Sequence, residues 1–182
     1  MNVHSLPNLI TIFRLILVLP FLLFLLNGDS KIAFYLFLAA GISDAVDGCL
    51  ARQFKWTSRL GAFLDPIADK LLLMGSFIGL AYLDQIPIWL AAIVIARDVI
   101  IVLGAIAYVR VVKHIDFVPS LISKVNTVCQ VLLVFLFLEQ YSFFPLPTML
   151  SQLMILTVVV TTLWSLADYI WVWGRRAYER AS

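Results

Sequence analysis

Residues 44–69, DAVDGCLARQFKWTSRLGAFLDPIAD, join two long apolar runs of the chain. Four aspartates lie in this stretch: Asp44 and Asp47 end the first run, and Asp65 and Asp69 begin the second. A carboxylate inside a membrane-spanning segment costs about 2.5–3.5 kcal/mol on insertion scales. Four such carboxylates so close together therefore indicate a function that repays this cost.

The composition of the whole chain indicates an integral membrane protein. Of its 182 residues, 63% are hydrophobic and 13% are charged, and the formal net charge is +2. Soluble domains have about 45–50% apolar and about 25% charged residues. These values exclude a soluble globule, a disordered chain and a protein that binds nucleic acid through a basic face. The length fits a single domain, residues 1–182.

Six apolar segments are long enough to cross a membrane, which takes about 20 residues in a helix. Lipid offers the backbone no hydrogen-bond partners, so each span must be helical. We therefore expect an all-α polytopic membrane protein with six transmembrane helices. A polar hinge precedes the third span, and Glu139 and Gln140 open the break after the fifth. The expected spans are 8–27, 31–51, 66–83, 86–110, 119–138 and 148–173.

Lysine and arginine are concentrated in the connections on one side of these spans. By the positive-inside rule, both termini and these connections face the cytoplasm. The first apolar run is long and no A-x-A-like cleavage site follows it, so we expect a retained helix rather than a signal peptide. We expect the protein in a bacterial-type inner membrane. The basic residues that set this orientation are Arg52, Lys55, Arg59, Arg110, Lys113, Arg175, Arg176 and Arg180.

The spacing of the four aspartates predicts a cation site. Asp44 and Asp47 are three residues apart and Asp65 and Asp69 are four apart, so each pair shares one helix face. If the two helices pack as a hairpin, the four carboxylates converge and need cations. Oxygen ligands suit hard divalent ions such as Mg²⁺, Mn²⁺ or Ca²⁺ rather than zinc. In the alternative, the carboxylates only hold the hairpin by pairing with Arg52, Arg59 and Lys70.

Small residues beside the carboxylates favour a ligand site over a purely structural hairpin. Gly48 and Gly61 allow a ligand to approach the backbone closely. Ala51 extends the small-residue face beside Asp47, and Arg52 is placed to bind a phosphate from the same side.

The pattern D-x-x-D-G-x-x-A-R, followed after eight residues by G-x-x-x-D-x-x-x-D, resembles the signature of the CDP-alcohol phosphotransferase family. All eight fixed positions match. The opening segment 7–14, PNLITIFR, is similar to that of the phosphatidylglycerol branch. The resemblance implies six helices around a polar chamber open to the cytoplasmic leaflet. It also implies two divalent ions, Mg²⁺ or Mn²⁺, among the four aspartates, and a homodimer.

The resemblance further implies the reaction and the role of each matched residue. An alcohol attacks the phosphorus nearest the lipid in CDP-diacylglycerol, and CMP leaves. Asp44, Asp47 and Asp65 are the principal metal ligands, while Asp69 ligates and also takes the proton of the alcohol. The residues expected to bind the CDP-lipid are Gly48, Ala51, Arg52, Gly61, Asn8 and Arg14. For Arg14, snorkelling to an interface is the alternative.

Two cations in later spans, Arg97 and Lys124, are the candidates for binding the acceptor alcohol. The alternatives are snorkelling or a pair with Asp98. Relatives that use glycerol 3-phosphate have two further cations, at the positions of Ala105 and Asn126. Fewer cations suit a phosphodiester, so we expect transfer to phosphatidylglycerol, giving cardiolipin and CMP. Transfer to glycerol 3-phosphate, giving phosphatidylglycerophosphate, is the alternative.

A transporter or cation channel is the competing class, because buried aspartates can line an ion path. The acidic residues here are concentrated in one hairpin near one face, and no inverted repeat is evident between the halves. A lipid-binding protein with a dead site would lack a ligand position, and none is missing. These observations favour an enzyme.

Overall fold

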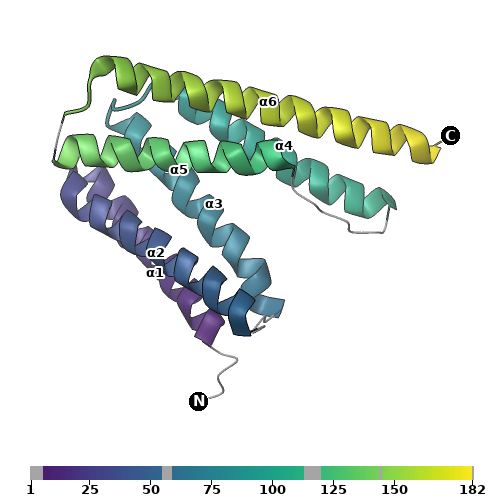
Figure 1. Cartoon of the computed structure of the whole chain (residues 1–182), viewed down its shortest axis with the longest axis horizontal. Coiled ribbons are helices and arrows are strands. Elements are labelled where there is room, and N and C mark those ends of the chain that lie inside the picture. The colour runs from purple at the N-terminus through teal and green to yellow at the C-terminus, as the bar shows by residue number, and fades with distance from the viewer. Residues whose placement is uncertain (1–5, 55–58, 113–119, 144, 182) are drawn as a thin grey trace. The chain divides into compact units, whose positions relative to one another are not determined.

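The computed structural model describes residues 6–54, 59–112, 120–143 and 145–181, and the side chains of 12–44, 66–104, 120–143 and 145–171. Within these ranges the chain forms six α-helices and no strand, as the composition predicts. The helices are α1 (Leu6–Leu26), α2 (Ser30–Phe54), α3 (Arg59–Tyr82), α4 (Ile88–Val112), α5 (Leu121–Ser142) and α6 (Thr148–Ala181) (Figure 1).

The third helix begins earlier than the sequence suggests. The expected polar hinge before residue 66 is wrong, because α3 starts at Arg59 and contains Pro66. A proline removes only its own N–H donor, and membrane helices tolerate this where neighbouring groups satisfy the freed carbonyl. The signature residues from Gly61 to Asp69 therefore belong to one continuous helix.

The fifth and sixth helices extend beyond their expected ends. Glu139 and Gln140 continue α5, because both residue types are good helix formers. The hydroxyl of Ser142 donates to the carbonyl of Leu138 at 2.6 Å and closes the last turn. The helix α6 continues to Ala181, beyond the end of the expected membrane span at residue 173.

Two helices in the described part of the chain are long and apolar enough to cross a membrane. They are Leu121–Ser142 and Thr148–Trp171, and Ile12–Leu26 is a shorter apolar helix. The expectation of six spans therefore stays a prediction.

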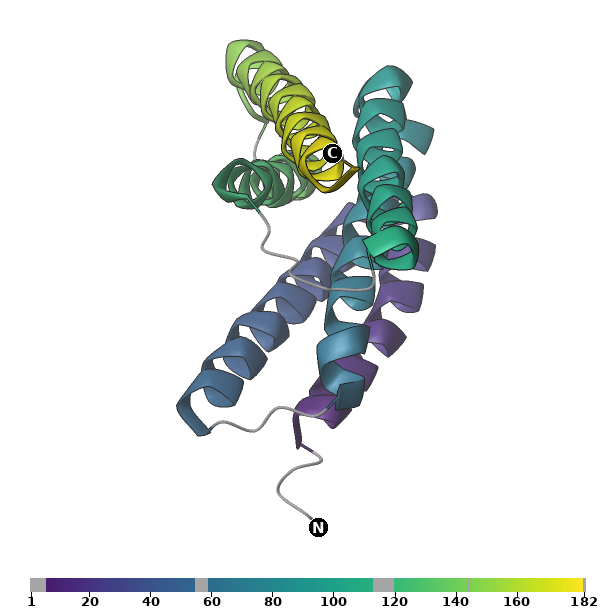
Figure 2. The same ribbon diagram turned by 90° about the vertical axis from the view of Figure 1, so that its right-hand side faces the viewer.

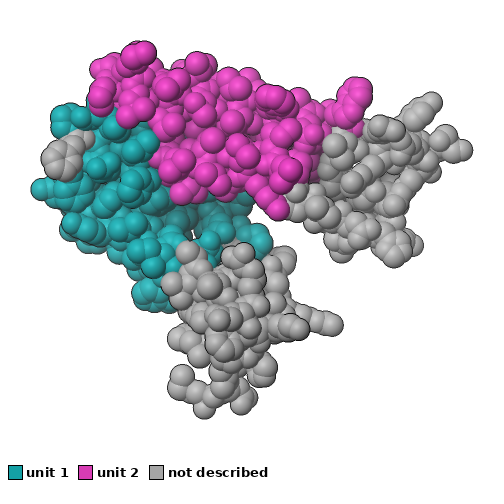
Figure 3. Space-filling model, in the orientation of Figure 1, with its two compact units in different colours: residues 1–86, 134–146 teal, residues 87–133, 147–182 magenta. Residues whose placement is uncertain are grey.

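The chain divides into two compact units, coloured separately in Figure 3. Unit 1 comprises residues 1–86 and 134–146, and unit 2 comprises residues 87–133 and 147–182. In unit 1, α1 packs against both α2 and α3, and it runs alongside them in Figures 1 and 2. In unit 2, α4 packs against α6.

Aromatic rings and close helix contacts form the core of unit 1. The rings of Phe21 and Phe37 lie 5.9 Å apart between α1 and α2. Phe34 contacts Phe135 at 5.3 Å and Phe143 at 5.4 Å, between ring centroids. Phe21 is fully buried, and its burial contributes a large apolar area to the packing of α1.

Two glycines of α3 let this helix approach α1 closely. A Cβ atom built on Gly75 would lie 2.7 Å from Cδ2 of Leu22. A Cβ atom on Gly79 would overlap the side chain of Leu25, which is itself fully buried. Since small residues are what allow membrane helices to pack at short range, these glycines set the distance between α1 and α3.

We expect Gly79→Val to destabilise unit 1, because the added side chain overpacks the contact with Leu25. Overpacking of this kind costs about 1–3 kcal/mol. The measurement is the thermal unfolding midpoint in detergent. Gly41→Val is the matched control, since the same change in α2 would place Cβ with nothing within 4 Å. Equal shifts of the unfolding midpoint in the two variants would show that the close approach of α1 and α3 does not restrict the size of the residue at position 79.

Candidate active site

The guanidinium of Arg14 joins two of the four signature aspartates. Its Nη1 donates a hydrogen bond to Oδ1 of Asp69 at 2.8 Å, and its Nη2 lies 2.7 Å from Oδ1 of Asp44. Asp44 belongs to α2 and Asp69 to α3, while Arg14 belongs to α1. Two carboxylates from separate helices are therefore brought to one cation on a third helix.

The three side chains of this triad differ sharply in exposure. Arg14 is 0% exposed, whereas the side chains of Asp44 and Asp69 are 49% and 46% exposed. Arg14 is thus fully buried and does not snorkel to an interface. The two carboxylates keep about half of their surface accessible, so a ligand can reach them while Arg14 stays covered.

The helical period of α1 places Arg14 between its two partners. Arg14, Val18, Phe21 and Leu25 are all buried and follow one another at intervals of four, three and four residues. This spacing forms a single stripe along a helix. The stripe is the face through which α1 packs on α2 and α3, and Arg14 is its charged member.

Seven of the predicted site residues lie outside the part of the chain whose side chains are described. The convergence of Asp44 and Asp69 is observed, and that of the full quartet stays a prediction. No group of three or more metal-binding side chains occurs among the side chains that are described. The seven residues are Asn8, Asp47, Gly48, Ala51, Arg52, Gly61 and Asp65.

The oxygens of Asp44 and Asp69 fit a hard divalent cation. Mg²⁺ binds in proteins through one or two carboxylates together with substrate phosphates and water. The triad holds one positive and two negative charges, so it keeps a net negative charge that attracts a cation. The chemistry of the donor set agrees with the cofactor predicted from the sequence.

Sequence reasoning did not identify Arg14 as the partner of these aspartates. It considered Arg52, Arg59 and Lys70 as structural cations, and assigned Arg14 to lipid binding or to snorkelling. The signal was present in the sequence: an arginine within an apolar helix needs an anion, and the aspartates of the next two helices supply it.

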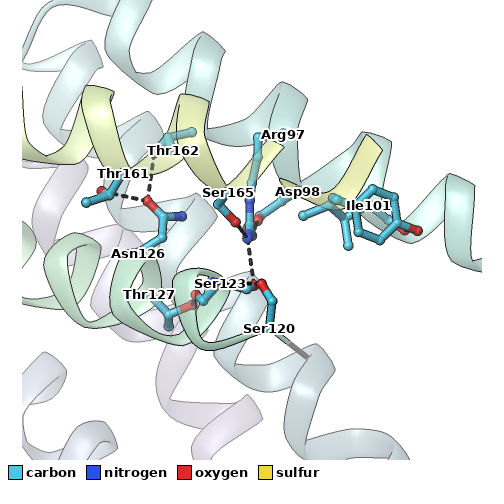
Figure 4. A network of polar contacts seen from close by, with 11 residues as sticks. Arg97, Asp98, Ile101, Ser120, Ser123, Asn126, Thr127, Thr161, Thr162 and Ser165 are labelled. Carbon is cyan, nitrogen blue, oxygen red and sulfur yellow. Dashed lines mark hydrogen bonds and ion pairs between the residues drawn. The ribbon is translucent and has the colours of Figure 1, made fainter. Parts of the chain in front are cut away.

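A second buried ion pair lies in unit 2, around Arg97 of α4 (Figure 4). Its Nη1 donates to Oδ1 of the adjacent Asp98 at 2.6 Å. Its Nη2 donates to the hydroxyl of Ser123 on α5 at 2.7 Å and also to the hydroxyl of Ser165 on α6. Arg97 and Asp98 are 2% and 3% exposed. The pairing with Asp98, one of the alternatives from the sequence, is confirmed.

Neutral hydrogen bonds continue this network along α5 and α6. Oδ1 of the fully buried Asn126 accepts from the hydroxyls of Thr161 at 3.0 Å and Thr162 at 2.9 Å. Lys124, the other candidate for acceptor binding, has an exposed side chain. The structure therefore places the two candidate cations in different environments, Arg97 inside the network and Lys124 on the surface of α5.

A comparison of the sequence with protein families finds a match to one family. The family described as CDP-alcohol phosphatidyltransferase matches residues 4–171. The chain belongs to this family. Its members are membrane-embedded, and the apolar helices of this CDP-alcohol phosphatidyltransferase agree with that.

Relatives of known name fall into two groups. A Drosophila melanogaster protein named probable cardiolipin synthase (CMP-forming) is 37% identical over 144 residues, which is 69% of this chain and 44% of the relative. The human cardiolipin synthase (CMP-forming) is 34% identical over 73% of this chain and 50% of its own length. The chain thus spans half or less of these two relatives.

Some relatives in the second group match over nearly the whole length of both proteins. A Haemophilus influenzae protein named CDP-diacylglycerol–glycerol-3-phosphate 3-phosphatidyltransferase is 31% identical over 174 residues. The match covers 92% of this chain and 92% of the relative. Both groups carry names from phospholipid biosynthesis, and the names differ in the acceptor alcohol.

We expect Asp98→Asn to destabilise unit 2, because it leaves the charge of Arg97 buried without its carboxylate. Removing one partner of a buried ion pair costs about 3–5 kcal/mol. The thermal unfolding midpoint in detergent measures the loss. Glu139→Gln, the same type of change at a partly exposed position near the end of α5, is the control and should shift the midpoint little. A neutral result for Asp98→Asn would contradict the buried pair.

Proposed function

We propose that this chain is an enzyme that transfers a phosphatidyl group from CDP-diacylglycerol to phosphatidylglycerol, giving cardiolipin and CMP. The observation that carries the proposal is the meeting of Asp44 and Asp69 on one guanidinium. These residues stand at the first and last aspartate positions of the family signature. Their convergence supports a site assembled from α1, α2 and α3.

In the proposed site the four aspartates hold the cofactor. Two Mg²⁺ or Mn²⁺ ions would be bound by Asp44, Asp47, Asp65 and Asp69. When bound, such ions neutralise the diphosphate and the charge that develops on the departing CMP. The half-exposed carboxylates of Asp44 and Asp69 support this assignment, since ligands must be reachable from the substrate side.

In the proposed reaction, the hydroxyl oxygen of phosphatidylglycerol forms a bond to the phosphorus nearest the diacylglycerol. The bond from that phosphorus to the oxygen of CMP breaks, and CMP leaves. The hydroxyl proton passes to Asp69, whose carboxylate must lie within hydrogen-bond reach of it. The hydrogen bond from Arg14 to Oδ1 of Asp69 supports this role by fixing the carboxylate.

The remaining signature residues form the proposed site for the CDP-lipid. Glycine and alanine at these positions allow the nucleotide to approach the backbone. Arg52 would bind a phosphate oxygen through its guanidinium. The residues assigned to this site are Asn8, Gly48, Ala51, Arg52 and Gly61. Arg14, which the sequence placed with them, is fully buried and reaches the site only through Asp44 and Asp69.

The charges of unit 2 support a phosphodiester as the acceptor. The charge of Arg97 is already matched by Asp98, and Asn126 contributes only neutral hydrogen bonds to Thr161 and Thr162. A phosphate monoester carries nearly two negative charges at neutral pH, whereas a diester carries one. In the proposal Lys124, whose side chain is exposed, contacts the acceptor, while Arg97, the other candidate from the sequence, stays in its buried network. One exposed cation suits the single negative charge of phosphatidylglycerol.

Transfer to glycerol 3-phosphate is the second candidate function. The observation in its favour is the match along 92% of both chains to the Haemophilus influenzae relative, whose name specifies glycerol 3-phosphate. The relatives named cardiolipin synthase match over a smaller part of their own length. The acceptor is therefore the part of the proposal that most needs an experiment.

The proposal includes the membrane arrangement expected from the sequence. Six helices span a bacterial-type inner membrane, both termini face the cytoplasm, and the chamber opens to the cytoplasmic leaflet. The protein forms a homodimer. The family and the apolar helices α5 and α6 support a membrane location in general.

We expect the purified protein, with Mg²⁺ or Mn²⁺ and CDP-diacylglycerol, to convert radiolabelled phosphatidylglycerol to cardiolipin. One CMP should be released for each cardiolipin formed. The measurement is product separation by thin-layer chromatography together with CMP quantification. Turnover with glycerol 3-phosphate and none with phosphatidylglycerol would show that glycerol 3-phosphate is the acceptor.

We expect Asp69→Asn to abolish CMP release while CDP-diacylglycerol binding persists, because the amide cannot take the hydroxyl proton. A general base contributes about 10²–10⁴-fold to the rate, so the rate of CMP release should fall at least about 10²-fold. Glu139→Gln is the control and should keep its rate. An ion flux that changes in Asp69→Asn, with no CMP from either form, would instead identify a channel.

A further inference from the structure

We propose that Arg14 is a positioning residue that holds Asp44 and Asp69 together before a divalent cation binds. The role in turnover depends on the proposed function, whereas the role in cation binding does not. Arg14 is fully buried, so it acts through the two carboxylates in the described structure. The inference concerns what assembles the cation site rather than what binds the lipid.

The first support is the geometry of the guanidinium. Its Nη1 donates a hydrogen bond to Asp69 at 2.8 Å, and its Nη2 forms an ion pair with Asp44 at 2.7 Å, so one planar group meets carboxylates from two helices. A planar fork of donors can hold two carboxylates at a fixed separation and angle. A lysine ammonium has the same charge but presents it as a single point, so it cannot fix both carboxylates in this way.

The second support is the packing of the helices. Asp44 on α2 and Asp69 on α3 both reach α1, and α1 is the helix that packs against each of the other two. The carboxylates repel each other, so without a cation they would tend to separate. The guanidinium of Arg14 supplies a positive charge from α1, the helix that contacts both. The buried stripe of α1 holds this side chain next to the two carboxylates.

The third support is the contrast in exposure. Fixing a side chain in one conformation costs entropy. Because Arg14 is buried in the folded protein, folding has already fixed its side chain before any ion binds. The half-exposed carboxylates are then presented with their separation set. A divalent ion that arrives at them finds two ligands in place, which is the general advantage of preorganised ligands.

The charge of Arg14 alone would have the opposite effect on cation binding. A positive charge beside the site repels a divalent ion, so removing it would strengthen binding if electrostatics decided the outcome. If positioning decides, removing Arg14 weakens binding although a repelling charge has gone. The sign of the change therefore distinguishes the two mechanisms.

The test uses full-length protein in detergent and Mn²⁺ as the probe, with free Mn²⁺ followed by electron paramagnetic resonance. We expect R14K and R14M each to raise the half-saturating Mn²⁺ concentration about tenfold, the usual size of the loss when a residue that orients metal ligands is removed. Lys31→Met, which removes an exposed cation elsewhere in unit 1, should leave it unchanged. Unchanged or tighter binding in R14M would overturn the proposal.

A second measurement keeps Arg14 in place, and so does not depend on the folding of the variants. Spin labels at Ile42→Cys and Leu71→Cys, both at exposed positions of α2 and α3, report the separation of the two helices. Cys49 and Cys129 are replaced by serine. We expect the same distance distribution with and without Mg²⁺, because the site is already assembled. A distribution that narrows or shifts on adding Mg²⁺ would show that the cation assembles the site.

The outcomes separate this inference from the proposed function. Wild-type protein that binds Mn²⁺ but releases no CMP would overturn the reaction and leave the role of Arg14 intact. Normal CMP release from R14K, with an unchanged Mn²⁺ requirement, would overturn the role of Arg14 alone. In the expected outcome, the Mn²⁺ concentration for half-maximal CMP release rises in R14K in step with the binding measurement.

Discussion

The burial of Arg14 constrains the rest of unit 1. A guanidinium with no exposed surface is tolerated only where anions offset the loss of its hydration. Asp44 and Asp69 provide these anions from two different helices, at 2.7 and 2.8 Å. The pairing therefore requires that one particular face of α2 and one particular face of α3 turn toward α1.

Apolar packing supports this polar contact further along the same helices. Gly75 and Gly79 bring α3 close to Leu22 and Leu25 of α1, and Phe21 packs on Phe37 of α2. Glycine is required at a close approach because any Cβ atom would meet the opposing leucine. The close contacts position the backbone of α1, and this in turn places Arg14 within reach of both carboxylates.

Unit 2 manages its buried polar groups in a different way. Arg97 is neutralised by Asp98, its neighbour in sequence, and the remaining contacts are hydroxyl and amide hydrogen bonds. Unit 1 retains a net negative charge at its triad, whereas this pair in unit 2 is balanced. That difference agrees with a divalent-cation site in the first unit.

The sequence determined the features that depend on local pattern. Long apolar runs find no hydrogen-bond partners in lipid, so their backbone must bond internally as a helix. The fixed positions of residues 44–69 identified the family. Helix ends were less well predicted. Pro66, of a type that usually breaks helices, lies inside α3, and the polar residue Glu139 lies inside α5. Local preference gives way there to the need to satisfy the backbone and to pack the helix on its neighbours.

Tertiary structure alone decided which charges meet between helices that are distant in sequence. Arg97 pairs with the next residue, so its partner was among the alternatives that the sequence offered. Arg14 and Asp69 are 55 residues apart, and their contact exists only because α1 packs against α3. An ion pair over such a separation depends on the relative rotation of two helices, and that rotation is set by the packing of Gly75 and Gly79 against α1 rather than by any local pattern.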